Sequence, residues 1–231
     1  MATSVAVVQF PGTNCEMDVV EAVESLGASA HVVFHDSTTL GGADAVVIAG
    51  GFAHGDYLRP GAIARFSPVM SAVEDHARRG GPVVGICNGF QVLTESHLLP
   101  GALQKNAGLK FRCGFTQLRV ESTDSPLTSG CAPGDVLRIP INHFEGNYTC
   151  SEEVLAELRE QDRIVLRYVD NPNGSVDDIA GICNESRNVV GLMPHPERAA
   201  HALLGSTDGR VMLESLIGTA ARSRTAAAAS S

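Results

Sequence analysis

Tryptophan is absent from the chain, and aromatic residues make up only 5% of its 231 positions. Positive charge is also scarce, because 17 Lys and Arg stand against 26 Asp and Glu and give a formal net charge of −9. Nucleic acids and anionic membranes are bound through cationic patches, and the longest basic cluster here is HARRG at 76–80. The composition therefore disfavours both classes of partner.

The chain also lacks long apolar runs and paired cysteine motifs. Its start, MATSVAVVQF, has no basic region and too short an apolar run for a signal peptide. No run approaches the roughly 20 apolar residues of a membrane span. None of the six cysteines forms a CxxC pair or has zinc-finger spacing with His; they stand at 15, 87, 113, 131, 150 and 183. We therefore expect a cytoplasmic protein with free thiols, without disulfides or a structural metal.

What the sequence does contain is a series of short, continuous apolar runs. Such runs are typical of strands covered on both faces, and they occupy 4–10, 29–36, 43–51, 81–87, 163–170 and 188–194. Helical patterns lie between several of them, at 13–27, 67–80 and 88–99. This alternation predicts an α/β fold, a doubly wound and mostly parallel sheet with helices on both faces.

The rest of the chain indicates additions to that sheet. The segments 111–122 and 134–144 are expected to be extra strands, and 177–194 is predicted to form a hairpin that turns at ESRN. Two final helices are predicted at 196–205 and 208–222. We assign residues 1–220 to a single domain and expect 221–231, within the small and polar TAARSRTAAAASS, to be a disordered tail.

The tetrapeptide GICN occurs twice, and the first copy has the setting of a nucleophile. Cys87 ends a predicted strand and is followed directly by a predicted helix, in the sequence GICNG. This is the G-x-S-x-G nucleophile elbow with cysteine in place of serine. A helix N-terminus stabilises a thiolate, which is the reactive form of cysteine. A buried cysteine at a strand end is the alternative interpretation of the elbow alone.

The second copy lacks that setting. Cys183 is followed by ESRN, a turn and not an amphipathic helix, and no glycine stands two residues after it. The nearby carboxylate of Glu185 would raise a thiol pKa. Cys183 is therefore predicted to be a half-buried strand residue that leads into the hairpin.

A base and its orienting acid are supplied by the segment MPHPER. His195 and Glu197 stand two residues apart in an extended Pro-His-Pro-Glu run, so their side chains can point the same way. Together with a thiol they form a nucleophile–base–orienter triad. A loop histidine followed by an acid at a helix start is the alternative, and the elbow at Cys87 weighs against it.

The glycine pair at 50–51 follows another predicted strand. Acyl transfer passes through an oxyanion that needs backbone N–H donors, and glycine lets the backbone approach the reacting atoms. The N–H groups of Gly51 or Phe52, with that of Asn88, are the candidate donors. An ordinary glycine turn is the alternative interpretation.

With these residues in place, the sequence resembles the class I glutamine amidotransferases. Several longer segments resemble more closely the family of glutaminase subunits of phosphoribosylformylglycinamidine synthase. The resemblance covers residues 4 to about 218. It is carried by FPGTNCE (10–16), GGFAHGDYLRPGAIARFSPVM (50–70), GICNGFQVLTE (85–95), LLPGAL (98–103) and GLMPHPERA (191–199).

The resemblance implies a flavodoxin-like fold and the hydrolysis of glutamine to glutamate and ammonia. It implies Cys87 as nucleophile with His195 and Glu197 as partners, and no metal. It also implies a set of residues near the bound glutamine: Gly51, Phe52, Asn88, Gln91 and His143. His143 and Glu145 match a His-x-Glu-Gly element of the family, in which Asn142 and Phe144 here replace small residues.

No G-x-x-x-x-G-K-[ST] or other nucleotide loop occurs in the chain. We therefore expect no cofactor in this chain, with ATP and Mg²⁺ used by a large synthetase partner that receives the ammonia. The resemblance also implies a small accessory subunit. The segment 52–66, FAHGDYLRPGAIARF, is a candidate partner-facing loop.

Three other functions remain open at this point. The chain could serve a synthetase that makes a cytidine, guanosine or histidine precursor, although the PGTNC and GDYLRPG segments argue against this. It could be a free-standing cysteine hydrolase or chaperone-like protein of related fold. It could also be a regulatory subunit with a decayed site, which the intact Cys87, His195 and Glu197 disfavour.

Overall fold

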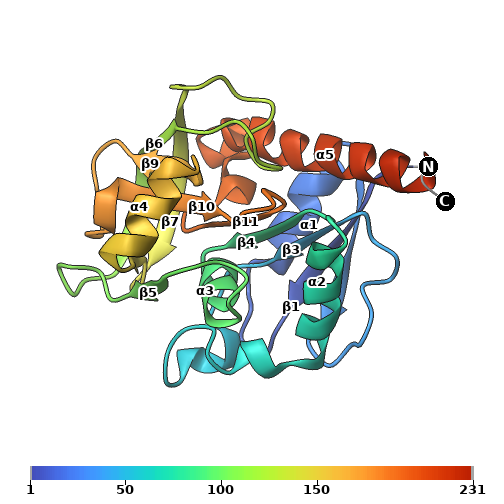
Figure 1. The fold of residues 1–231 in the computed structure, drawn as a ribbon, viewed down its shortest axis with the longest axis horizontal. Helices are drawn as coiled ribbons and strands as arrows, with labels where there is room; N and C mark the ends of the chain where they lie inside the picture. The colour runs from blue at the N-terminus through green and yellow to red at the C-terminus, as the bar shows by residue number, and fades with distance from the viewer. Residues whose placement is uncertain (1, 230–231) are drawn as a thin grey trace.

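The computed structural model describes residues 2–229 (Figure 1). Its strands are β1 Ser4–Gln9, β2 Ser29–Phe34, β3 Ala45–Ile48, β4 Val83–Ile86, β5 Ala102–Gln104, β6 Arg112–Val120, β7 Val136–His143, β8 Asn147–Thr149, β9 Ile164–Tyr168, β10 Ile179–Cys183 and β11 Val189–Leu192. Its α-helices are α1 Glu16–Ser25, α2 Pro68–Arg78, α3 Asn88–Glu95, α4 Glu152–Glu160 and α5 Gly209–Ala229. Short 3₁₀ turns are η1 Ala53–Asp56, η2 Ala64–Phe66, η3 Val176–Asp178, η4 Pro196–Ala199 and η5 Ala202–Leu204.

One large sheet organises the molecule, with the strand order β2-β1-β3-β4-β11-β10-β9-β6-β7. The first five strands in this order are parallel. With β11 as the fifth strand, they have the flavodoxin-like order 2-1-3-4-5. The other four strands extend the sheet in antiparallel fashion. The predicted α/β fold, a mostly parallel doubly wound sheet with added antiparallel strands, is confirmed.

The parallel strands are buried on both faces, as their continuous apolar runs predict. Residues 5–8 of β1 and 45–48 of β3 have no exposed surface. Fully burying one such side chain stabilises the fold by about 1.5–3 kcal/mol. Helices α1 and α5 cover one face, where Ala22 and Leu213 form a small apolar cluster with Ala200, while α2 and α3 cover the other (Figure 1).

Because parallel strands share one carboxyl edge, the loops after β1, β3 and β4 meet at the same place. The reversal of strand order lies between β1 and β3, and their following segments bond there, since the N–H of Cys15 donates to the carbonyl of Gly50 at 3.2 Å. This edge is where the sequence places its candidate nucleophile and glycine pair. No helix of the described residues is long and apolar enough to cross a membrane.

The additions to the sheet agree with the sequence in part. Strands β6 and β7 lie within the two segments predicted as strands, and β10 and β11 form the predicted hairpin. Helix α4 was not predicted from its sequence. A capping signal was present, since the hydroxyl of Ser151 accepts a hydrogen bond from the N–H of Val154 at 3.3 Å.

Two C-terminal predictions need correction. The helix expected at 196–205 is instead two 3₁₀ turns, η4 and η5, separated by extended backbone at His201. The disordered tail expected at 221–231 is helical as far as the structure describes it, because α5 continues to Ala229. Alanine has the highest helix propensity, and Arg224 pairs with Asp44 at 2.8 Å. Residues 230 and 231 lie outside the described part.

Candidate active site

Cys87 lies at the junction of β4 and α3, as the elbow predicts. Its backbone has φ 53° and ψ −106°, in a region that residues with a side chain rarely adopt. Such strain persists where the surrounding structure enforces it, and it is concentrated at functional sites. Gly89 permits the turn, because a Cβ there would lie 2.1 Å from the carbonyl oxygen of Ile48. The elbow therefore presents Cys87 at the carboxyl edge of the sheet.

His195 and Glu197 form a buried hydrogen-bonded pair just after β11, the strand beside β4. His195 Nδ1 and Glu197 Oε1 are 2.6 Å apart, and both side chains are at most 2% exposed. The contact predicted from their spacing is thus present, although η4 carries Glu197 in a 3₁₀ turn and not in an extended run. With Nδ1 engaged, Nε2 is the ring nitrogen that remains available to Cys87.

The charge of this pair follows from its surroundings. Burial by itself lowers the pKa of His195, but the negative charges of Glu197 and the Cys87 thiolate outweigh it and raise the pKa to about 10. A proton on His195 is therefore stabilised by both neighbours. A positive charge on an imidazole beside a cysteine sulfur is the kind of neighbour that activates a thiol nucleophile.

The glycine pair after β3 brings the backbone close to these groups. A Cβ on Gly50 would lie 2.9 Å from His195 Cε1 and 3.3 Å from Cys87 Cβ, so only glycine fits there. The N–H of Phe52 donates to the carbonyl of Gly12 at 3.0 Å and is occupied. The N–H of Gly51 has no such partner among the described residues, and it borders the cavity in front of Cys87. Of the two alternatives, the geometry favours Gly51.

A cavity of about 200 Å³ opens in front of the Cys87 thiol. It brings together four of the predicted substrate-binding residues and two carboxylates. Its lining consists of Gly51, Phe52, Asp56, Cys87, Gln91, Asn142, His143, Phe144 and Glu145. Asn88 is absent from this lining, because its side chain points to other partners.

The amide of Asn88 joins helix α3 to the loop that follows β3. Its Oδ1 accepts from the N–H of Ala53 at 3.0 Å, and its Nδ2 donates to Asp56 Oδ1 at 3.1 Å and to Gln91 Oε1 at 2.8 Å. Gln91 in turn donates to the carbonyl of Glu145 at 2.5 Å. These bonds fix the walls of the cavity. Because the side chain of Asn88 is occupied by them, only its backbone N–H, the first of helix α3, remains to take part in the site.

Two half-buried carboxylates face this cavity, and the sequence did not single out Asp56 as a cavity residue. Burial raises the pKa of Asp56 to about 6, and the charge of Glu145 adds to this effect. Burial also raises the pKa of Glu145. Two carboxylates held beside each other favour a cationic group between them.

His143 lies at the cavity floor, as its motif predicts. Its Nδ1 is 3.2 Å from Asn106 Oδ1, and its buried Nε2 has no partner. Burial and the positive charge of His195 lower the pKa of His143 to about 4. The ring is therefore neutral near pH 7 and can serve as a hydrogen-bonding group but not as a charge.

The thiol pKa of Cys183 is raised, as predicted, although for a different reason, and the residue is fully buried where the sequence predicted a half-buried one. It is fully buried at the end of β10, and burial is the main cause of its raised pKa. The side chain of Glu185, expected to contribute, is 76% exposed and lies near Arg163. The hairpin setting predicted for this cysteine is confirmed.

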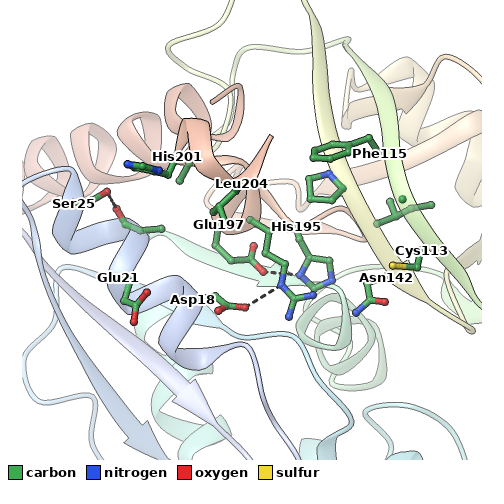
Figure 2. A pocket seen from close by; sticks show the side chains of 16 residues that line it. Asp18, Glu21, Ser25, Cys113, Phe115, Asn142, His195, Glu197, His201 and Leu204 are labelled. Atoms are coloured by element: carbon green, nitrogen blue, oxygen red, sulfur yellow. Dashed lines mark hydrogen bonds and ion pairs between the residues drawn. The ribbon is translucent and has the colours of Figure 1, made fainter. Parts of the chain in front are cut away.

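A larger cavity, of about 680 Å³, lies on the other side of the catalytic pair (Figure 2). Figure 2 shows His195 and Glu197 joined by their hydrogen bond, with Asp18 of α1 on the side toward them. Cys15, His195 and Glu197 place ligand atoms within 4.8 Å of one another, which is close enough to consider a metal. However, the guanidinium of Arg198 donates to Cys15 Sγ at 3.0 Å and would repel a cation.

Known proteins match the chain over nearly its whole length. The family described as CobB/CobQ-like glutamine amidotransferase domain matches residues 2–210. The phosphoribosylformylglycinamidine synthase subunit PurQ of Rubrobacter xylanophilus is 57% identical over 213 residues, which cover 92% of this chain and 97% of that one. The PurQ subunit of Methanosarcina acetivorans is 52% identical over 222 residues, covering 92% and 96%.

Solved structures agree with these matches. A chain in the structure of PurLQS from Thermotoga maritima superposes with a TM-score of 0.88 at 42% identity, covering 95% of this chain and 99% of that chain. A putative GMP synthase component from Thermoplasma acidophilum shares the fold, with a TM-score of 0.70 at 18% identity, covering 97% of each chain. The chain therefore belongs to the CobB/CobQ-like glutamine amidotransferase family and, within it, to the group of phosphoribosylformylglycinamidine synthase PurQ subunits.

Proposed function

We propose that this chain is the glutaminase subunit of a phosphoribosylformylglycinamidine synthase, and that it releases ammonia from glutamine for a synthetase partner. The observation that carries the chemistry is the strained elbow at Cys87 next to the buried His195–Glu197 pair. The high identity to PurQ subunits supports the pathway, the de novo synthesis of purines. The free state of all six cysteines supports a reducing, cytoplasmic location.

The reaction follows from this geometry. The Cys87 thiolate attacks the carboxamide carbon of glutamine, and the oxyanion that forms is stabilised by the N–H groups of Gly51 and Asn88. His195 then gives its proton to the amine as the C–N bond breaks, so that ammonia leaves and a thioester remains. A water molecule, deprotonated by His195, attacks the thioester and releases glutamate. Glu197 holds the imidazole in place and stabilises its charged form.

The amino-acid end of glutamine would occupy the cavity lined by the two carboxylates. We assign its ammonium group to Asp56 and Glu145, because burial raises the pKa of both carboxylates and a bound cation would offset the cost of keeping them charged. Gln91 and His143 line the same cavity and can supply further hydrogen bonds. This assignment extends the predicted substrate-binding set by Asp56 and gives Asn88 a part through its backbone.

If this assignment is correct, glutamine affinity should fall as the pH falls through about 6, where Asp56 gains its proton. Asp56→Asn should weaken binding about 10–100-fold at pH 7.5, because a hydrogen bond to a charged group contributes about 1.5–3 kcal/mol. It should also flatten the pH dependence. Calorimetry on a Cys87→Ala chain, which cannot consume glutamine, measures both effects.

Asp75→Asn provides the control, since Asp75 lies on α2 and its carboxylate pairs with Arg78 away from the cavity. Wild-type affinity in the Asp56→Asn chain at pH 7.5 would contradict the assignment of the ammonium site.

The partner receives the ammonia and uses it together with ATP. We propose a large ATP- and Mg²⁺-dependent synthetase, which converts formylglycinamide ribotide to formylglycinamidine ribotide, and a small accessory subunit. The PurLQS structure contains a chain similar to this one, which supports such an assembly. This chain itself is proposed to need no cofactor.

The loop 52–66 is the surface that we assign to this partner. It exposes four large apolar side chains, with Phe52 45%, Tyr57 73%, Leu58 89% and Phe66 74% exposed. It is also tied to the nucleophile helix, because Arg59 donates two bonds to the carboxylate of Glu95, at 2.9 and 2.8 Å. A partner that contacts this loop could therefore act on Cys87 through α3.

Replacing Tyr57 and Leu58 together by alanine should weaken the complex by roughly 30-fold, because buried aromatic anchors contribute about 2 kcal/mol or more at interfaces. The melting temperature of the isolated chain should change little, since both side chains are exposed. Arg59→Ala should reduce the stimulation of glutaminase by the partner. Binding is measured by titration calorimetry, with Val136→Ala on β7 as control. Unchanged affinity and stimulation in both variants would remove the loop from the interface.

The function itself is tested by purifying the tagged chain from its own cells with glutamine and ADP present. Recovery of a large formylglycinamide ribotide synthetase, and glutamine-dependent ammonia release by the recovered complex, are the expected results. Recovery of a different synthetase would leave the chemistry in place and overturn the pathway. A complex that forms but releases no ammonia from glutamine would identify a regulatory subunit.

A further inference from the structure

A polar cluster that the triad chemistry does not use lies behind the catalytic pair. Arg198 follows Glu197 directly in the chain, and its guanidinium joins two residues at the start of α1. Its Nε donates to Asp18 Oδ2 at 2.9 Å, and its Nη2 donates to Cys15 Sγ at 3.0 Å. The dashed line at Asp18 in Figure 2 is this ion pair. The cluster therefore fastens η4, which carries Glu197, to helix α1.

The carboxylate of Glu197 needs such support. Its Oε1 is bonded to His195, but its Oε2 is buried and has no hydrogen-bond partner. A buried carboxylate oxygen without a partner is costly unless a nearby charge compensates it. The guanidinium of Arg198 belongs to the next residue in the chain. Burial lowers the pKa of Arg198, but its negative neighbours, Glu197 among them, outweigh this and raise it.

The other titratable groups around the pair include the third member of the triad, two neutral groups and two charged ones. They come from four elements: Cys87 at the start of α3, His143 of β7, Cys15 and Asp18 at the start of α1, and Arg198 of η4. Burial and the charge of Glu197 raise the pKa of Cys15 to about 12, so its thiol keeps its proton. His143 is neutral near pH 7 because its pKa is lowered. Arg198 and Asp18 thus carry the charges that can act on the pair from outside the triad.

We propose that Arg198, held by Asp18 and Cys15, is a positioning residue for the catalytic pair. It fixes the carboxylate of Glu197 against His195 and limits how strongly that carboxylate holds the proton of the imidazole. The effect of this role on turnover rests on the proposed glutaminase function. Its geometry rests on the contacts of η4 with α1. The cluster lies outside the cavity in front of Cys87, so it should affect turnover and not glutamine binding.

The charges predict titration shifts of opposite sign. Arg198→Met removes a cation and leaves Glu197 uncompensated, so the titration midpoint of His195 should rise by about half a pH unit or more. Asp18→Asn removes an anion and should lower the midpoint. Arg198→Lys keeps the charge and should leave the midpoint near its original value. Carbon-13 NMR of the His195 ring measures these midpoints, with the signal assigned by its loss in a His195→Asn chain.

The titration is best followed in a Cys87→Ala background, because removing the thiolate brings the midpoint of His195 down from about 10 into a range that the fold tolerates. Arg222→Met serves as the control, since it removes the same charge from α5, where Arg222 bonds to Thr219. In chains that keep Cys87, Arg198→Met should lower kcat about tenfold with KM unchanged, and Arg198→Lys should restore most of it.

Shifts of opposite sign in the Arg198→Met and Asp18→Asn chains support the inference. If the His195 midpoints of the Arg198→Met and Asp18→Asn chains equal those of the Arg198→Lys and Arg222→Met chains, the inference is overturned and the cluster is only a structural contact. Asp18→Asn keeps the test decisive if Arg198→Met does not fold, because Asp18 is partly exposed and its replacement is mild. The titration needs no substrate, so its result does not depend on the proposed function. If the midpoints shift as expected but the wild-type complex releases no ammonia, only the proposed function is contradicted.

Discussion

Replacing Cys87 with alanine is expected to abolish ammonia release from glutamine, with a loss of about 10⁴-fold or more, as when the nucleophile is removed from other catalytic triads. The remaining groups can bind glutamine but cannot form the thioester. Synthesis by the complex from added ammonia should continue, since the partner carries that reaction. Ammonia release and ribotide amination, measured separately on the same preparation, test the two halves of this expectation.

The chain offers a matched control in its second GICN. Cys183 is also buried, but it ends β10 inside a hairpin and has no helix behind it. Cys183→Ala should leave both activities near normal and cost about 1 kcal/mol in unfolding free energy, for the loss of a buried sulfur. Loss of glutamine turnover in a folded Cys183→Ala protein would show that the elbow argument is wrong.

The second large effect is expected from Glu197→Gln, which should lower kcat by about 10²–10⁴-fold, because a neutral amide no longer holds His195 in the correct tautomer. The carboxylate is fully buried and lies 2.6 Å from Nδ1 of the imidazole, so no solvent molecule replaces it easily. The pH range of activity should also narrow at its alkaline end. Steady-state kinetics between pH 6 and about 10 would reveal both changes.

The same pair gives a stability test with a definite sign. Folding raises the pKa of His195 from 6.5 to about 10, so the pair stabilises the fold fully below about pH 6.5 and loses this contribution as the pH rises toward 10. In Glu197→Gln this dependence should be weaker, as urea unfolding at several pH values would show. Glu197→Asp, which keeps the charge on a shorter side chain, is the control. Wild-type turnover in Glu197→Gln would remove this residue from the triad.

Much of this molecule could be predicted from its sequence, because its signals are local. The buried strands β1, β3 and β4 are continuous apolar runs, and a parallel sheet is the structure that hides both of their faces. Cys87 was identified by the glycines around it, and Gly89 indeed allows helix α3 to pack directly on the backbone of β3. The contact of His195 with Glu197 follows from their spacing of two residues.

What could not be predicted depends on partners that are distant in sequence. The segment after His195 has a helical composition, yet it forms short turns because Glu197 must reach His195 and His201 pairs in extended form with Ser206. Whether Gly51 or Phe52 has the free N–H depends on Gly12, which takes the bond of Phe52. Cys15 and Asp18 come after β1, whereas Arg198 comes after β11, and no spacing rule in the sequence connects them.

The order of strands in the sheet also decides when the site can exist. Strand β11, which directly precedes the catalytic histidine, pairs with β4, and Val189 lies beside Val83 in that ladder. Loop closure over such a separation is slow, and long-range parallel pairing delays folding. Cys87 also precedes His195 in the chain, so during translation the nucleophile is made well before its base. A partly made chain therefore has a thiol without a proton acceptor. Ammonia release is in this way restricted to molecules whose sheet is complete.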